Sequence, residues 1–190
     1  MAMEATATRS YLIPGSDLSL DERRAIRGDT DKRLMDAALK VGIRADVREL
    51  IIRDTSPNVD LGLAAQDDWL IAGAGVVGVE LQYINAVIAQ DRVVGFYGAA
   101  AELAAIPSLS RLRFTVGAAS ATTWAQYALE QLYTRLEQFG YFGEPVLYTR
   151  TQTARIMVMP RIAFIVNSER LTLFARTIEP LGERISAPSI

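Results

Sequence analysis

Three glycines in the middle of the chain have the spacing of a backbone turn that can hold a phosphate. They are Gly73, Gly75 and Gly78, in a stretch rich in Ala, Gly and Val. In such a turn the first glycine permits a tight bend, the second lets the backbone approach a pyrophosphate, and the third lets a helix pack closely on a strand. The chemistry that this spacing suggests is nucleotide binding.

The segment 69–140 resembles a Rossmann dinucleotide-binding domain, with the three glycines at the phosphates. The resemblance implies an α/β fold. Such domains carry an acidic residue about 20 residues further on, at the end of the second strand. This chain has Phe96, Tyr97 and Gly98 there. Residues 79–83 also alternate like a strand, which would place the glycines at bulges or close backbone approaches. Nucleotide binding is therefore the alternative function.

The chain contains no histidine and no cysteine. Their absence excludes a thiol nucleophile, a disulfide, a thiolate metal site and a histidine general base. Ser108 and Ser110 consequently lack the histidine of a catalytic triad. The adjacent carboxylates Asp67 and Asp68 would point to opposite faces of a strand and make a poor chelate. We therefore predict no enzyme, no metal site and no cofactor.

The charge balance favours protein partners. Lys plus Arg number 20 and Asp plus Glu 22, which gives a net charge of −2 and is too acidic for a dedicated nucleic-acid surface. No segment has the apolar length of a membrane span. Arginine suits flat contacts at interfaces, although arginines on edge strands can also form a charged solvent face. The candidate interface residues are Tyr11, Leu12, Ile13, Arg150, Arg155, Arg161, Arg170 and Arg176.

The N-terminal part, residues 1–42, is predicted to be an arm followed by a helical segment. The sequence from Ser19 to Glu22 is a capping box that begins a helix. This helix is expected to break near Gly28 and to end at Gly42, a natural C-terminal cap. The arm and helix are expected to lie outside the main domain or against a neighbour.

Residues 43–190 are predicted to form the main α+β domain. Its sheet is expected to be mainly antiparallel, as a sandwich or a partly closed barrel, with an α/β Rossmann-like fold as the alternative. Three polar residues, Arg111, Arg113 and Thr115, alternate with Leu112, Phe114 and Val116, which is typical of a strand with one solvated face. Aromatic residues between 123 and 139 have helical spacing and predict a long packed helix. The strands are expected near 47–53, 69–83, 92–97, 111–117 and 145–178.

Much of residues 44–187 resembles structural proteins of tailed-bacteriophage particles, of the head-decoration, head-closure or neck type. The resemblance is carried by segments such as Arg53-Asp54-x-x-Pro57-x-x-Asp60, Leu112-Arg113-Phe114-Thr115-Val116-Gly117 and Gly140-Tyr141-Phe142. It implies a protein of the virion, assembled in the host cytoplasm, that binds copies of itself and other virion structural proteins. It implies no active site.

Overall fold

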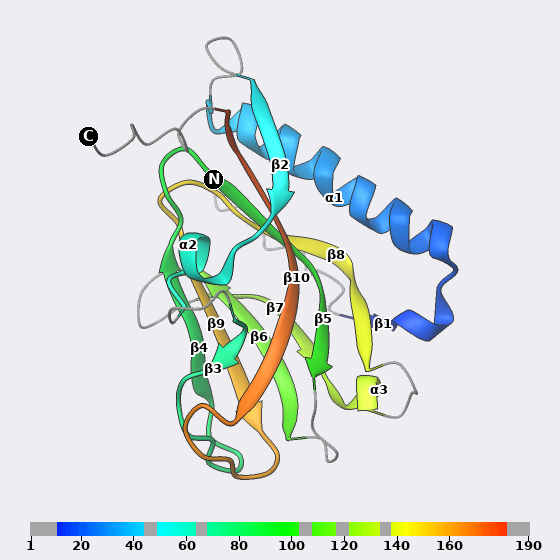
Figure 1. The fold of residues 1–190 in the computed structure, drawn as a ribbon, viewed down its shortest axis with the longest axis vertical. Helices are drawn as coiled ribbons and strands as arrows, with labels where there is room; N and C mark the ends of the chain where they lie inside the picture. The colour runs from blue at the N-terminus through cyan, green and yellow to red at the C-terminus, as the bar shows by residue number, and fades with distance from the viewer. Residues whose placement is uncertain are drawn as a thin grey trace, which may run out of the picture.

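A computed structural model describes residues 11–43, 49–63, 68–102, 108–116, 122–133 and 138–181. In these residues two antiparallel sheets pack face to face, and one long helix covers part of the outer face of the larger sheet (Figure 1). This arrangement confirms the mainly antiparallel α+β sandwich. The sheets do not close into a barrel.

The larger sheet has the order β1-β8-β5-β10-β2, and a short strand, β3, also pairs with β10. Its strands are β1 (Leu12–Pro14), β8 (Phe139–Tyr148), β5 (Val93–Glu102), β10 (Glu169–Pro180), β2 (Leu50–Asp54) and β3 (Leu70–Ile71). The smaller sheet has the order β4-β9-β6-β7. Its strands are β4 (Leu81–Val87), β9 (Thr153–Pro160), β6 (Leu109–Val116) and β7 (Thr122–Ala128). All strand pairs of the described residues are antiparallel, which overturns the Rossmann-like alternative.

Aromatic side chains fill the space between the two sheets. The Tyr127 and Phe142 rings stack with centroids 4.1 Å apart, and Phe114 meets both rings edge-on. Phe96 and Tyr148 extend this cluster. Large rings bury much apolar area per residue and prefer these offset and edge-to-face arrangements. The cluster therefore fixes how the two sheets face each other.

The long helix is α1 (Leu20–Lys40), and it begins at the predicted capping box. It runs through Gly28 without a break, because one glycine costs a helix only about 1 kcal/mol. Leu34 and Ala38 pack with Val93 and Ile178, which lie on the face of the larger sheet that points away from the other sheet. The helix thus contacts this chain's own sheet, whereas the sequence placed it outside the main domain.

The predicted helix over residues 123–139 is wrong. The structure has β7 there, then a short helix, α3 (Glu130–Tyr133), and the start of β8 at Phe139. Aromatic residues at three- and four-residue spacing suggested a helix, but Ala125 and Tyr127 are buried while Gln126 and Ala128 are exposed. This alternation suits an edge strand, and pairing with β6 gives β7 a place in the sheet.

The C-terminal strands follow the prediction more closely. β9 and most of β10 lie in the region 145–178 that is predicted to form strands, whereas β8 begins earlier, at Phe139. Asn167 lies in the turn before β10, with a positive φ of 58°. Residues 161–166 are not a strand. They form a loop with one isolated bridge, between Phe164 and Gly75.

Candidate interaction surfaces and a buried ion-pair network

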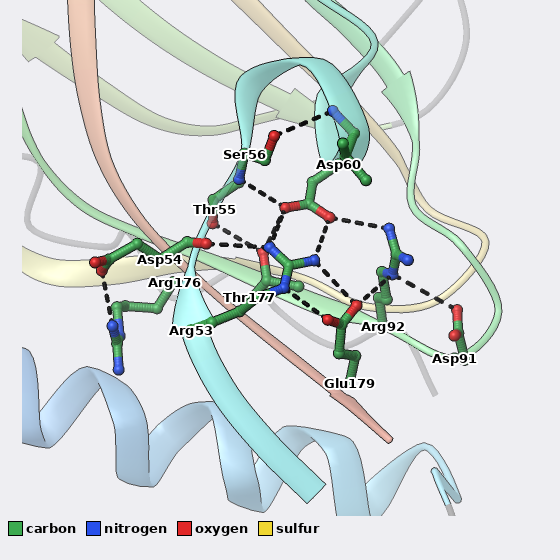
Figure 2. A network of polar contacts seen from close by, with 11 residues as sticks. Arg53, Asp54, Thr55, Ser56, Asp60, Asp91, Arg92, Arg176, Thr177 and Glu179 are labelled. Atoms are coloured by element: carbon green, nitrogen blue, oxygen red, sulfur yellow. Dashed lines mark hydrogen bonds and ion pairs between the residues drawn. The ribbon is translucent and has the colours of Figure 1, made fainter. Parts of the chain in front are cut away.

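A network of four charged side chains lies at one end of the sandwich (Figure 2). Its members are Arg53 of β2, Asp60 of α2 (Pro57–Leu61), Arg92 just before β5, and Glu179 of β10. The Asp60 side chain is 0% exposed and that of Glu179 only 5%. We call these four residues the buried ion-pair network.

Arg53 is the centre of this network, and it uses every N–H of its guanidinium. Nη1 and Nη2 donate to the two Asp60 carboxylate oxygens at 2.6 and 2.8 Å. Nε and Nη2 donate to the two Glu179 oxygens at 2.6 and 3.0 Å, and Nη1 also donates to the Asp54 carbonyl at 3.1 Å. A guanidinium held by two carboxylates in this way has no donor left for a ligand.

Arg92 completes the charge balance. Its Nη1 donates to Asp60 at 2.9 Å, and its Nε lies 2.9 Å from Glu179 but outside hydrogen-bond geometry. Two guanidinium groups therefore face two carboxylates. The network is neutral as a whole, which is the condition under which buried charges are tolerated.

Burial raises the pKa of the Asp60 carboxyl, but hydrogen bonds from Arg53 and the Ser56 N–H, with the charges of Arg53 and Arg92, outweigh it. The net effect lowers the pKa of Asp60 below its ordinary value. The same hydrogen bonds to Asp60 and Glu179 raise the pKa of Arg53. Because Arg53 of β2 donates to carboxylates of both α2 and β10, we interpret the network as a structural clamp that joins these three elements.

The glycine motif lies in the loop between β3 and β4. Gly78 has a positive φ of 74° and is followed by β4 instead of a helix, so the predicted phosphate turn lacks its helix N-terminus. Gly75 instead pairs with Phe164, with its N–H donating to the Phe164 carbonyl at 2.9 Å. An added Cβ at Gly73 would lie 2.7 Å from the Leu81 side chain. Gly73 and Gly75 therefore allow close approach of Leu81 and Phe164, as the strand interpretation expected, whereas Gly78 adopts a left-handed conformation with open space around it.

Substituting Gly75 by Val should loosen the two loops, because an added Cβ would enter the Phe164 ring. We expect a loss of about 1–3 kcal/mol in the free energy of unfolding, the usual effect of overpacking. Chemical denaturation measures it. In the control Gly28→Ala the new Cβ meets nothing within 4 Å, and removing a helical glycine should stabilise the protein by roughly 0.5–1 kcal/mol. Equal stability of Gly75→Val and the unmodified protein would contradict the close contact.

An exposed apolar tip is formed by this loop and by the loop between β9 and β10, which lie together at the lower end of Figure 1. Gly78 N–H also donates to the Pro160 carbonyl at 3.0 Å, so backbone hydrogen bonds hold the two loops side by side. We define the apolar tip by its exposed branched side chains, which are Val76, Val77, Val79, Ile162, Ile165 and Val166. Ile165 is 76% exposed. Large exposed apolar patches on soluble proteins commonly mark contacts with other molecules.

A cluster of partly exposed aromatic rings lies on the outer face of the larger sheet, and we call it the aromatic face. Its residues are Tyr11, Tyr97, Phe139, Tyr141 and Phe174. Tyr97 and Tyr141 stack with centroids 6.2 Å apart, and Phe174 lies within 6 Å of both. The Arg23 guanidinium lies 5.0 Å from the centre of the Phe139 ring. Aromatic and arginine side chains together are typical of protein interfaces.

The predicted N-terminal arm contributes to the edge of this face. β1 pairs with β8, and Leu12 turns inward, where it is 5% exposed in the core of the same chain. Ile13 lies opposite Tyr141 on the outer side. Tyr11 lies over Gly143, where an added Cβ would enter its ring. Tyr11 and Ile13 thus lie at the surface, whereas Leu12 is buried in the core.

The five candidate arginines do not form one patch. Arg176 is 8% exposed, and Asp31 and Asp54 of the same chain bind its guanidinium at 3.0 and 2.7 Å. Burial lowers the pKa of Arg176, but the hydrogen bonds to these two carboxylates outweigh it and raise the pKa overall. Arg176 is thus engaged inside the chain.

The other four arginines differ in surroundings. Arg170 pairs with Asp68 at 2.7 Å, and Arg161 lies 3.8 Å from Glu130, with both side chains more than half exposed. Arg150 is exposed on the turn after β8. Arg155 lies on β9, in the middle of the smaller sheet.

A pocket of about 240 Å³ opens between β7 and β8, lined by residues that include Trp124, Glu144 and Leu147. Its volume is below the usual range for small-molecule sites. Among the described residues, no group of His, Cys, Asp and Glu side chains is arranged to hold a metal ion. None of the helices in the described part of the chain is long and apolar enough to cross a membrane.

Comparison with known proteins adds no assignment. No protein-family model, no curated protein and no solved structure matches this chain.

Proposed function

We propose that this protein is a structural component of a tailed-phage particle that assembles by contacts between copies of itself and with other virion proteins, without catalysis. The proposal rests on one observation in particular. The chain carries two separate apolar surfaces, the apolar tip and the aromatic face, on different parts of the fold. The phage resemblance of the sequence supports the same function.

The occupant that we propose for the aromatic face is the apolar tip of a second copy. The tip is a projection of branched aliphatic side chains, and the face is a cluster of stacked, tilted and edge-on rings. Because the two surfaces differ, the contact is head-to-tail, and such contacts repeat into rings or open filaments. Head-to-tail contacts of this kind can build a virion component from repeated copies of one chain.

The free energy of association indicates why each copy needs more than one contact for a stable assembly. Complete burial of one exposed aliphatic side chain contributes about 1.5–3 kcal/mol. The six tip side chains are on average a little over half exposed, so burying their exposed parts contributes roughly 5–10 kcal/mol. The loss of translational and rotational freedom on association costs about 4–15 kcal/mol. One tip contact is therefore close to balance. Ring closure, in which each copy makes two contacts, should stabilise the assembly.

Replacing Ile165 by Asp should abolish assembly, because a charge would have to be buried at the centre of the contact. Native mass spectrometry at one protein concentration measures the oligomers, and thermal unfolding checks that the fold is unchanged. The matched control is Val87→Asp, since Val87 is 67% exposed on β4, outside both surfaces. If Ile165→Asp assembles as the unmodified protein does, the tip contact is refuted.

The place of the protein in the virion needs a separate measurement. Mass spectrometry of proteins from gradient-purified phage particles of the source culture should detect this chain in many copies per particle. Complete particles that lack the chain would refute the virion proposal, whatever the oligomeric state of the isolated protein.

A further inference from the structure

The outer face of the smaller sheet carries three arginines. Arg111 and Arg113 lie on β6, and Arg155 lies on the neighbouring β9. Leu112 and Ile156, which alternate with them, are fully buried in the core between the sheets. Successive side chains of a strand point to opposite faces, so the arginines point outward. We call these three residues the arginine face.

Strand register brings the three arginines close together. Arg113 pairs with Met157, which is two residues from Arg155 along β9, so Arg113 and Arg155 are diagonal neighbours. Diagonal side chains on a sheet are about 7–8 Å apart, within reach of long side chains. Arg111 and Arg113 are two residues apart on one strand and share one carboxylate, that of Glu80.

The charges of the arginine face are only partly balanced. Glu80 accepts from Arg111 Nη2 at 3.1 Å and from Arg113 Nη2, and Thr123 accepts from Arg113 Nη1 at 3.2 Å. Arg155 makes no ion pair with the described residues. Its buried Nε, like those of Arg111 and Arg113, has no hydrogen-bond partner there. Three guanidinium groups and one carboxylate leave an excess of two positive charges.

Buried donors without partners are uncommon in folded proteins, and a guanidinium satisfies them best with a carboxylate or a phosphate. Two methionines, Met157 and Met159, lie on the same side of β9 as Arg155 and are partly exposed. Methionine is adaptable and favours contact with apolar protein side chains. A surface of mixed arginine and methionine suits an acidic protein segment better than nucleic acid, especially in a chain with a net charge of −2.

We propose that the arginine face binds an acidic segment of another protein, whose carboxylates pair with Arg155 and Arg113 and whose apolar side chains contact Met157 and Met159. This surface is distinct from the apolar tip and the aromatic face, so the inference does not depend on self-assembly. In a particle it would add a second kind of contact, with a partner of opposite charge.

A fluorescein-labelled peptide of alternating Glu and Leu tests the proposal by fluorescence anisotropy against the full chain. We expect binding that weakens with added salt, and no binding of the Gln-Leu peptide. Arg155→Gln should weaken binding about tenfold or more, which is the effect of losing one charge-assisted contact. Because Arg155 has no described partner, its loss should leave the thermal unfolding temperature unchanged.

Two further variants serve as controls, since one should leave peptide binding unchanged and the other should tighten it. Arg150→Gln removes the same charge from an exposed turn and should leave binding unchanged. Glu80→Gln removes the carboxylate that competes for Arg111 and Arg113 and should tighten binding. The proposal fails if the Glu-Leu peptide does not bind, or if Arg150→Gln and Arg155→Gln weaken binding equally. It also fails if a single-stranded DNA binds more tightly than the peptide in a manner that Arg155→Gln abolishes.

Discussion

Asp60→Asn should lower the free energy of unfolding by about 3–5 kcal/mol, because it removes one partner of a buried ion pair and leaves the other partner charged. Arg53 and Arg92 both donate to this carboxylate, so the variant leaves two guanidinium groups facing the single carboxylate of Glu179. The amide of the variant also puts an N–H donor where a carboxylate oxygen accepted a hydrogen bond. A domain of this size has a total stability of roughly 5–15 kcal/mol. The unfolding temperature should therefore fall by roughly 10 °C, measured by calorimetry or circular dichroism.

The stability of the protein should also depend on pH through this residue. A carboxyl whose pKa is lower in the folded than in the unfolded state stabilises the fold above its unfolded pKa, about 3.9 for Asp. That contribution is lost as the pH falls from about 4 through the lowered folded pKa. The Asp60→Asn protein should lose this part of its acid sensitivity, as followed by urea unfolding at a series of pH values.

Asp21→Asn is the matched control for this prediction. The Asp21 side chain is 92% exposed and pairs with Arg24 on the surface of α1, where such pairs contribute about 0–1 kcal/mol. The two Asp→Asn variants change the same atoms in different surroundings. Equal unfolding temperatures for both would show that the buried ion-pair network does not stabilise the fold.

Two assembly-deficient variants should restore a contact when they are mixed. Ile165→Asp removes the apolar tip but leaves the aromatic face, whereas Tyr11→Asp with Tyr141→Ser removes the face but leaves the tip. In a head-to-tail contact each variant keeps one working surface. Each should be a monomer alone, and the mixture should form a one-to-one dimer that grows no further.

Native mass spectrometry distinguishes the species once the two chains differ in mass by isotope labelling. Val87→Asp mixed with the unmodified protein is the control, and it should give the same oligomers as the unmodified protein alone. Dimers that form within one variant, or a mixture that stays monomeric while both variants remain folded, would contradict the head-to-tail contact. An interface of identical surfaces would not show the complementation.

The alternation of polar and apolar residues predicted those strands that bury only one of their two faces. The alternation of Arg111 and Arg113 with Leu112 and Phe114 identifies β6, and the solvated side is the arginine face. The pattern holds only as far as a register shift between Phe114 and Thr115, after which Thr115 is buried. No residue type in the sequence indicates this β-bulge, so the alternation alone could not predict that Thr115 is buried.

The errors arose where one sequence pattern suits two structures. The spacing of Trp124 and Tyr127 fits a helix stripe, whereas the burial of Ala125 and Tyr127 follows the alternation of a strand. The choice depends on whether β6 offers a free edge. The spacing of the three glycines fits a phosphate-binding turn, and it also fits a loop whose backbone passes close to Phe164. Long-range pairing decides both cases.

The buried ion-pair network was beyond sequence reasoning for a related reason. Asp60 follows Arg53 by seven residues, which gave no sign of burial, and Glu179 is 126 residues away from Arg53. The phage resemblance includes the segment Arg53-Asp54-x-x-Pro57-x-x-Asp60, but it implies no role for the charged side chains of that segment. Only the packing of β10 beside β2 reveals that these charges meet.

The position of β10 has a consequence for synthesis on the ribosome. It lies between β5 and β2, and it also pairs with β3, yet it is the last of the described strands along the chain. Until residues 169–180 emerge, β1, β8 and β5 can pair, but β2 and β3 lack their partner strand, and Arg53 and Arg92 lack the carboxylate of Glu179. Contacts so distant in sequence form slowly, and the unpaired edges are prone to aggregate meanwhile. An incomplete chain that ends before β10 would lack Phe174 and with it a complete aromatic face. The self-assembly that we propose would therefore take up only chains that have been translated through that strand.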